Sequence, residues 1–318
     1  MVGDCKFWIG SSPYLSMPLD ATFVEEKQLL FVADASRNEC LCFNMASKQI
    51  KKISYPGVSR PNSVFSQMNE IFVKDDYGIH KFSITEDMNG QSSCTYANKV
   101  VSLEETNCAG LSGLTDETGN VYLLTVSVKD KLLYAIDAQH SVMTSISLPI
   151  TGSRSTQRMV TCRPNLSQYP NNNNQFSFYC SNIAENRVTK CTVGFKSMNF
   201  IKSGVKVESD FLISGRRGGR SSSSSSTRTR NAFTQTYPRY SQMAGLCFDN
   251  DNNLFTSDSK ERTLYKFDAD YQFEGRVNVV DQNGDKQMIR FGGLEFSPRY
   301  KSVNKTHNLI RLIRLIPY

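Results

Sequence analysis

The chain has 318 residues, a formal net charge of +7 and a hydrophobic fraction of 39%. No apolar run approaches the roughly 20 residues of a membrane span, so the composition predicts a soluble protein without membrane contact. The first residues lack a basic segment followed by an apolar one, and the nine cysteines are an odd number, which argues against a secretory signal and a disulfide framework. We therefore expect a cytoplasmic protein, or an extracellular one if the N-terminus is incomplete.

A unit of two apolar strands recurs along the chain. Residues 30–43 align without a gap on residues 254–267, and each copy has an aromatic side chain in its first strand. Alternating apolar and polar positions on both sides of a polar turn are typical of a β-hairpin with one buried face. The same aromatic position is filled at Phe31, Phe72, Tyr122, Tyr179 and Phe255.

A third strand and a turn precede this hairpin. Gly-Leu pairs occur at residues 113–114, 245–246 and 293–294, and the turn pattern at residues 116–120 is matched at residues 249–253. Each unit therefore predicts a Gly-Leu strand, a polar turn, an aromatic strand, a second turn, a third strand and a variable fourth strand. Repetition of such a unit at several tens of residues predicts a closed ring of blades.

These motifs resemble NHL-type repeats, which form six-bladed β-propellers. The resemblance covers residues 17–298, and it is carried by the Gly-Leu pairs, the turn and an aliphatic-x-x-Phe-Asp ending. An arginine that such repeats often carry before the third strand is present as Arg187 and Arg262. The resemblance implies an all-β, six-bladed β-propeller with four-stranded antiparallel blades.

The two ends of the chain are expected to close this ring. A sixth unit starts at Gly293, and the apolar tail at residues 309–316 reads as a strand. Residues 6–9 would then add the outermost strand of the last blade and remove its exposed edge. We predict one domain over residues 1–318, because each propeller blade packs mainly on its neighbours.

One segment departs from this pattern. Residues 214–231 are rich in arginine, serine and glycine and cannot bury enough apolar surface to order themselves. They read either as a tolerated insertion or as an electrostatic tether for RNA or another acidic partner, with the serines as possible phosphorylation sites. The candidate partner-binding residues are Arg216, Arg217, Arg220, Arg228 and Arg230.

Several apparent metal sites do not meet their requirements. Asp249, Asp251 and Asn253 have the opening spacing of a calcium loop, but Lys260 stands where a bidentate glutamate is needed. Cys40 and Cys42 share one strand face and have no second pair at zinc-ligand spacing, so we expect core packing. The three histidines, at residues 80, 140 and 307, occupy unequal positions in their repeats, which disfavours a shared zinc site.

Two classes of function remain. The first is a non-enzymatic, monomeric scaffold without a cofactor, which holds a protein or RNA partner on a propeller face. The second is a calcium-dependent lactonase or a strictosidine-synthase-like enzyme on the same fold, which places carboxylates and amides around a central ion. Among the starts of the inner strands, Asn62 and Glu295 are the candidate metal ligands, too few for a hard divalent ion, so the first class is favoured.

Overall fold

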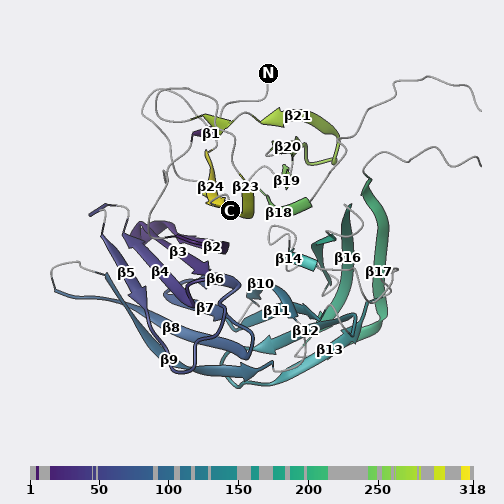
Figure 1. Cartoon of the computed structure of the whole chain (residues 1–318). Coiled ribbons are helices and arrows are strands. Elements are labelled where there is room, and N and C mark those ends of the chain that lie inside the picture. The colour runs from purple at the N-terminus through teal and green to yellow at the C-terminus, as the bar shows by residue number, and fades with distance from the viewer. Residues whose placement is uncertain are drawn as a thin grey trace, which may run out of the picture.

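A computed structural model shows a chain built almost entirely of β-strands arranged in a ring (Figure 1). In the described part the exception is a short 3-10 helix, η1 (Glu25–Lys27). The structure describes residues 5–6, 15–44, 46–47, 49–88, 92–103, 108–115, 119–127, 130–148, 159–164, 175–182, 187–196, 199–213, 243–248, 253–258, 261, 263–277, 279–280, 290–297 and 309–315.

Five sheets contain four strands each, and in every one the strands follow one another in the chain and pair antiparallel. The first sheet is β2 (Pro18–Val24), β3 (Leu29–Asp34), β4 (Glu39–Asn44) and β5 (Ile50–Ile53). The second is β6 (Ser63–Gln67), β7 (Glu70–Lys74), β8 (Gly78–Glu86) and β9 (Ser92–Ser102). The third is β10 (Cys108–Thr115), β11 (Val121–Ser127), β12 (Leu132–Asp137) and β13 (Met143–Ser147). The fourth is β14 (Met159–Pro164), β15 (Gln175–Asn182), β16 (Arg187–Lys196) and β17 (Asn199–Ile213). The fifth is β18 (Met243–Phe248), β19 (Leu254–Asp258), β20 (Thr263–Phe267) and β21 (Phe273–Val277).

The first strands of the sheets form the inner wall of the ring. Contacts run from β2 to β6, from β6 to β10, from β10 to β14 and from β14 to β18. Strand β23 (Arg290–Ser297) contacts both β18 and β2, and so lies between the fifth and first sheets. Antiparallel four-stranded sheets in a ring are the β-propeller arrangement that the repeats predict.

The closing of the ring differs from the sequence prediction. The C-terminal strand is present as β24 (Leu309–Leu315), which pairs antiparallel with β23. The N-terminal strand β1 (Cys5–Lys6) does not join that sheet: Lys6 pairs in parallel with Val280 of β22 (Val279–Val280). For Lys6 the predicted pairing with the C-terminal strand is therefore replaced by pairing with Val280, although β1 still contacts β24, and residues 7–9 of the predicted strand lie outside the described residues. Residues 279–280 follow β21 as an extended, β-branched pair, and their backbone groups satisfy those of residues 5–6.

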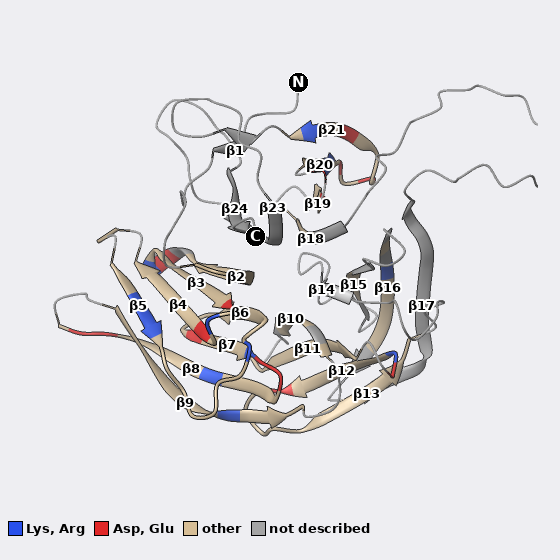
Figure 2. Cartoon of the chain, viewed as in Figure 1, with Lys and Arg blue, Asp and Glu red and all other residues tan. Residues whose placement is uncertain are grey.

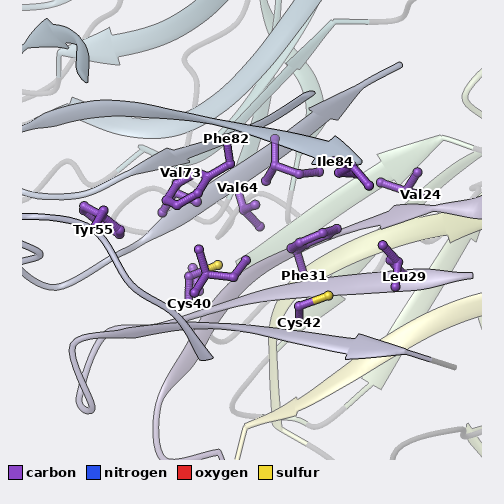
Figure 3. Close-up of a cluster of buried hydrophobic side chains, with 13 residues drawn as sticks. Val24, Leu29, Phe31, Cys40, Cys42, Tyr55, Val64, Val73, Phe82 and Ile84 are labelled. Atoms are coloured by element: carbon purple, nitrogen blue, oxygen red, sulfur yellow. The ribbon is translucent and has the colours of Figure 1, made fainter. Parts of the chain in front are cut away.

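The core lies between neighbouring sheets, and the second strands β3, β11 and β19 are buried on both of their faces. In β3, Phe31 and Ala33 face the second sheet, whereas Leu30 and Val32 belong to a separate cluster on the other face of the first sheet. Figure 3 shows Phe31 among side chains of both sheets. This alternation follows from the two-residue period of a strand.

The repeated aromatic residues occupy the expected interior positions. Phe31, Phe72, Tyr122, Tyr179 and Phe255 are each at most 6% exposed and lie in the second strand of successive sheets. The first four each pack in a cluster with the following sheet. All five side chains are therefore buried, and the first four lie between neighbouring sheets.

Contacts between the first and second sheets show the relative direction of their first strands. Asp20 Oδ2 accepts a hydrogen bond of 3.2 Å from the Val64 amide, and two residues further along both strands the Thr22 and Ser66 hydroxyl groups lie 2.8 Å apart. Strands β2 and β6 therefore run in the same direction. We call the end where the chain enters the first strand of each sheet the entry end, and the opposite end the far end. Because the strands of each sheet pair antiparallel, its second strand ends and its third begins at the entry end, whereas its first and third strands end at the far end.

Candidate functional site

The candidate metal ligand Asn62 lies at the entry end, immediately before β6. Its Oδ1 accepts a hydrogen bond of 2.8 Å from the Nζ of Lys74, the last residue of β7. Lys74 is only 2% exposed, and burial lowers the pKa of its ammonium to about 8 although Cys108, Asp76 and Asp75 oppose the shift. An ammonium therefore already uses the oxygen that was the proposed ligand for a divalent cation.

Asp75, the next residue, holds the surrounding backbone together. Its Oδ1 accepts hydrogen bonds from the amides of Tyr77 and Gly78, at 2.9 and 3.0 Å. Its Oδ2 accepts from the Ser59 amide and the Tyr55 hydroxyl, each at 3.2 Å. One carboxylate thus joins the β7–β8 turn to the segment that enters the second sheet.

The charge of Asp75 is maintained despite burial of its side chain. Burial acts to raise the pKa of this carboxyl, but His80 and the amides of Tyr77 and Ser59 outweigh that effect and hold the pKa below its ordinary value. His80 Nε2 lies 3.4 Å from Asp75 Oδ2, within ion-pair distance. The arrangement favours a carboxylate that serves the fold, because its oxygens are directed to internal donors.

His80 itself is enclosed by aromatic rings. It is 3% exposed, and its ring centroid lies 4.3 Å from that of Tyr55 and 6.1 Å from that of Tyr96. Neither ring nitrogen has a hydrogen-bond partner among the described residues. Burial raises the pKa of the Tyr55 hydroxyl above its ordinary value, with Asp75 adding to the effect.

Asp34 performs in the first sheet the task that Asp75 performs in the second. Its two oxygens accept hydrogen bonds from the amides of Ser16 and Met17, at 2.6 and 2.9 Å, and Oδ1 also accepts one of 3.3 Å from the amide of Arg37. Asp34 is the last residue of β3 and Asp75 follows the last residue of β7, and each carboxylate bonds to the segment that enters the first strand of its sheet. An aspartate recurs at this position because its carboxylate accepts hydrogen bonds from the backbone of the entering segment.

The remaining sequence candidates do not converge with Asn62 in the described part of the chain. Glu295 lies in β23 opposite Arg311, and its side chain is outside the described residues. The five arginines at residues 216–230 and His307 also lie outside them. His140 is at the far end of the third sheet, where its Nδ1 lies 2.8 Å from Asp137 Oδ2. The described residues include no group of three or more His, Cys, Asp or Glu side chains arranged to hold a metal.

Cys40 and Cys42 lie in the core between the first and second sheets, as their two-residue spacing predicts (Figure 3). Cys94 of β9 packs against the same cluster. Burial raises the pKa of Cys42 and of Cys94 to about 12, and that of Cys40 well above its ordinary value. The three thiols are therefore protonated at neutral pH and unsuited to nucleophilic or metal-ligand chemistry.

Sequence reasoning missed the Lys74–Asn62 contact and the roles of Asp75 and His80. A signal was available, because Asp34, Asp75 and Asp258 all follow the aromatic position of their repeat by three residues. Lys74 is also a charged residue at the end of an apolar strand, a position where a polar partner is expected.

Comparison of the sequence with known protein families and with curated proteins gives no match. No helix in the part that the structure describes is long and apolar enough to cross a membrane.

Comparison of the fold with solved structures does give matches. A Bacteroides thetaiotaomicron protein of unknown function aligns with 92% of this chain and 67% of its own, at a TM-score of 0.57 and 12% sequence identity. An auxiliary nutrient binding protein from the same organism aligns with 88% of this chain and 64% of its own, at a TM-score of 0.54 and 10% identity. Regucalcin from Agrobacterium tumefaciens, a calcium-binding protein, aligns with 88% and 78%, at a TM-score of 0.50 and 13% identity. At these identities the likeness establishes the fold.

Proposed function

We propose that this chain is a non-enzymatic β-propeller that binds a partner protein. The observation that carries the proposal is that Asn62, Asp34 and Asp75 at the entry end are bonded to internal donors. Catalysis with a hard divalent ion requires several oxygen ligands that converge and remain available. In the described part of this end, such oxygens bond to backbone amides, to Tyr55 and to the Lys74 ammonium.

The proposal includes a ring of six blades of the NHL type. The contacts of β23 with both β18 and β2 support a sixth position in the ring. In the part of the chain that the structure describes, the sheet at that position contains only β23 and β24. An experimental structure with four strands in this sheet supports the six-bladed count, and a structure in which β23 belongs to the fifth sheet rejects it.

The alternative is a calcium-dependent hydrolase or lyase, for which the likeness to a calcium-binding protein is a reason to test. A ligand that binds the folded state at about 100 times its Kd stabilises that state by about 2.7 kcal/mol. We expect millimolar Ca²⁺ to leave the melting temperature of this chain unchanged. A rise with Ca²⁺ that Asn62→Ala or Glu295→Gln abolishes would favour the enzyme.

Partner binding is tested by chemical crosslinking and mass spectrometry with the intact chain as bait in an extract of its native cells. The expected result is a saturable protein partner that excess free chain displaces. Failure to find one in extracts from several growth conditions contradicts the proposal.

The proposal assigns a second contact, with RNA or an acidic protein, to the arginines at residues 216–230. Five positive charges without an intervening acidic residue favour association with a polyanion. The test is a salt series of partner affinity with the native chain and a variant in which the five arginines are replaced by glutamine.

A further inference from the structure

The large apolar side chains that are exposed in the described residues gather at one end of the ring. Met68, Met88, Val142 and Met143 lie in or beside far-end connections and are 66%, 106%, 50% and 42% exposed. One further side chain of this kind, Tyr77 at 50% exposed, lies at the entry end. Exposed apolar side chains that cluster on one face are typical of an interaction surface.

Met68 is the most informative of these residues. It begins the two-residue turn between β6 and β7 and adopts a φ of 52°, in the left-handed region. Glycine or asparagine adopts this conformation at lower cost, and an exposed methionine gains little from packing within the chain. Contact with a partner would account for an apolar side chain here, since methionine is enriched at protein interfaces.

One hydrogen bond and one ion pair link residues in or beside three far-end connections. The Asn69 carbonyl, next to Met68, accepts a hydrogen bond of 2.7 Å from the Ile84 amide, near the end of β8. Strand β8 then leads through Glu86 to Met88. Lys27 of η1 in the first sheet lies 2.5 Å from Glu86. We call Met68, Met88, Glu26, Glu86 and Asp87 the methionine surface; Val142 and Met143 extend its end of the ring on the third sheet.

The charge of the methionine surface is opposite in sign to that of the whole chain. Glu26, Glu86 and Asp87 are exposed acidic residues, and Figure 2 shows acidic residues in red where the chain leaves β8 towards β9. The described residues of the three connections include one basic side chain, Lys27, which is bonded to Glu86. A chain with a net charge of +7 thus carries three exposed acidic residues and two exposed methionines on linked connections at its far end.

We infer that the methionine surface binds a segment of a partner protein that carries basic and apolar side chains together. The inference rests on the proposed binding function and adds to it the face and the chemistry of the partner. Apolar side chains of the segment would cover Met68 and Met88, while its basic groups would face the acidic residues Glu26, Glu86 and Asp87. RNA is disfavoured at this surface by its phosphate charge.

The test uses a random-peptide display library selected on the intact chain, followed by affinity measurement for an enriched peptide. We expect enriched peptides to combine Lys or Arg with large apolar residues. The double variant Met68→Glu with Met88→Glu should weaken their binding at least about tenfold. Tyr77→Glu, an exposed aromatic residue at the entry end, is the matched control and should leave affinity unchanged. Glu26→Gln with Asp87→Asn should weaken binding less and flatten its salt dependence. Equal urea midpoints must show that all variants fold.

Four outcomes overturn the inference: no enriched peptide, enrichment of acidic peptides, loss of binding in Tyr77→Glu alone, or wild-type dimerisation that the methionine variants abolish, which assigns the surface to a second copy. The proposed function is judged separately with the wild type and the double variant as crosslinking baits. A partner captured equally by both keeps the proposed function and rejects this surface, whereas failure of the wild type to capture any partner rejects the proposed function.

Discussion

At the entry end of the ring, Asp34 and Asp75 are buried and bonded to backbone amides, whereas at the far end Met68 and Met88 are exposed with acidic residues around them. The polar groups of the first end thus have their partners within the chain, and the apolar groups of the second do not. For these four residues, the difference separates side chains that serve the fold from side chains that are available to another molecule. Substitutions that separate stability from binding can break or sharpen this comparison.

The largest loss of stability is expected in the core that separates the two ends. Phe31→Ala removes a fully buried ring from the cluster between the first and second sheets. The lost transfer free energy and the remaining cavity should lower the free energy of unfolding by about 3–5 kcal/mol. Urea denaturation measures this loss, with exposed Met143→Ala as the control. A loss below about 1 kcal/mol would show that Phe31 does not pack as described.

At the entry end, Asp75→Ala leaves the amides of Ser59, Tyr77 and Gly78 without their acceptor. Removal of one member of a buried network should lower the free energy of unfolding by about 3 kcal/mol. Glu86→Ala, at an exposed position of the far end, should lower the free energy of unfolding by less than about 1 kcal/mol. Equal losses in the free energy of unfolding at the two positions would contradict the difference between the two ends.

The same carboxylate predicts a pH dependence. Because the folded-state pKa of Asp75 lies below its ordinary value, its contribution is fully present above the unfolded pKa of about 4 and is lost as the pH falls through the lower, folded value. The stability difference between the native chain and Asp75→Asn should therefore shrink as the pH falls below about 4. Acid titration of both proteins by circular dichroism measures it.

Lys74 predicts a pH dependence in the alkaline range. Its folded-state pKa of about 8 lies below the ordinary value of 10.5, so the unfolded chain binds more protons at intermediate pH. As the pH rises from 8 to about 10.5, the free energy of unfolding of the native chain should increase by on the order of 1–3 kcal/mol relative to that of Lys74→Met. Urea midpoints at several pH values test this, and parallel curves for the two proteins would show that the Lys74 ammonium is not desolvated.

The smallest effect on stability is expected at the far end. Met68→Glu with Met88→Glu should change the free energy of unfolding by less than about 0.5 kcal/mol, because both side chains are exposed. Urea denaturation provides the measurement. A loss of 2 kcal/mol or more would mean that these methionines pack within the chain and that the two ends are alike.

Much of the fold could be predicted because it depends on patterns that recur in the sequence, namely the two-residue alternation within a strand and the repeated aromatic position. The two-residue alternation placed Cys40 and Cys42 on one face, and the recurrence of Phe31 as Phe72 and Tyr122 located the buried second strands. Closure could not be predicted in the same way. Pairing of Lys6 with Val280 joins segments far apart in the chain, and no repeat encodes their register.

The candidate site was less predictable than the fold. The sequence identified Asn62 as a candidate metal ligand at the start of an inner strand, but an amide oxygen can accept a hydrogen bond from an ammonium or bind a metal. The choice depended on Lys74, twelve residues away, whose side chain meets Asn62 only because β6 and β7 pair with Ser63 opposite Lys74. Recognition of that contact required the register of a hairpin that the sequence could only outline.

Each four-stranded sheet is formed by consecutive strands, and this has a consequence for the order of folding. A nascent chain can complete the hydrogen-bonded ladder of one sheet before the next sheet has been synthesised, so these ladders close short loops only. The long-range steps are the packing of finished sheets against one another and the pairing of β1 with β22. Assembly can therefore proceed blade by blade from the N-terminus, and the junction between β23 and β2 is the last inner contact of the ring to form.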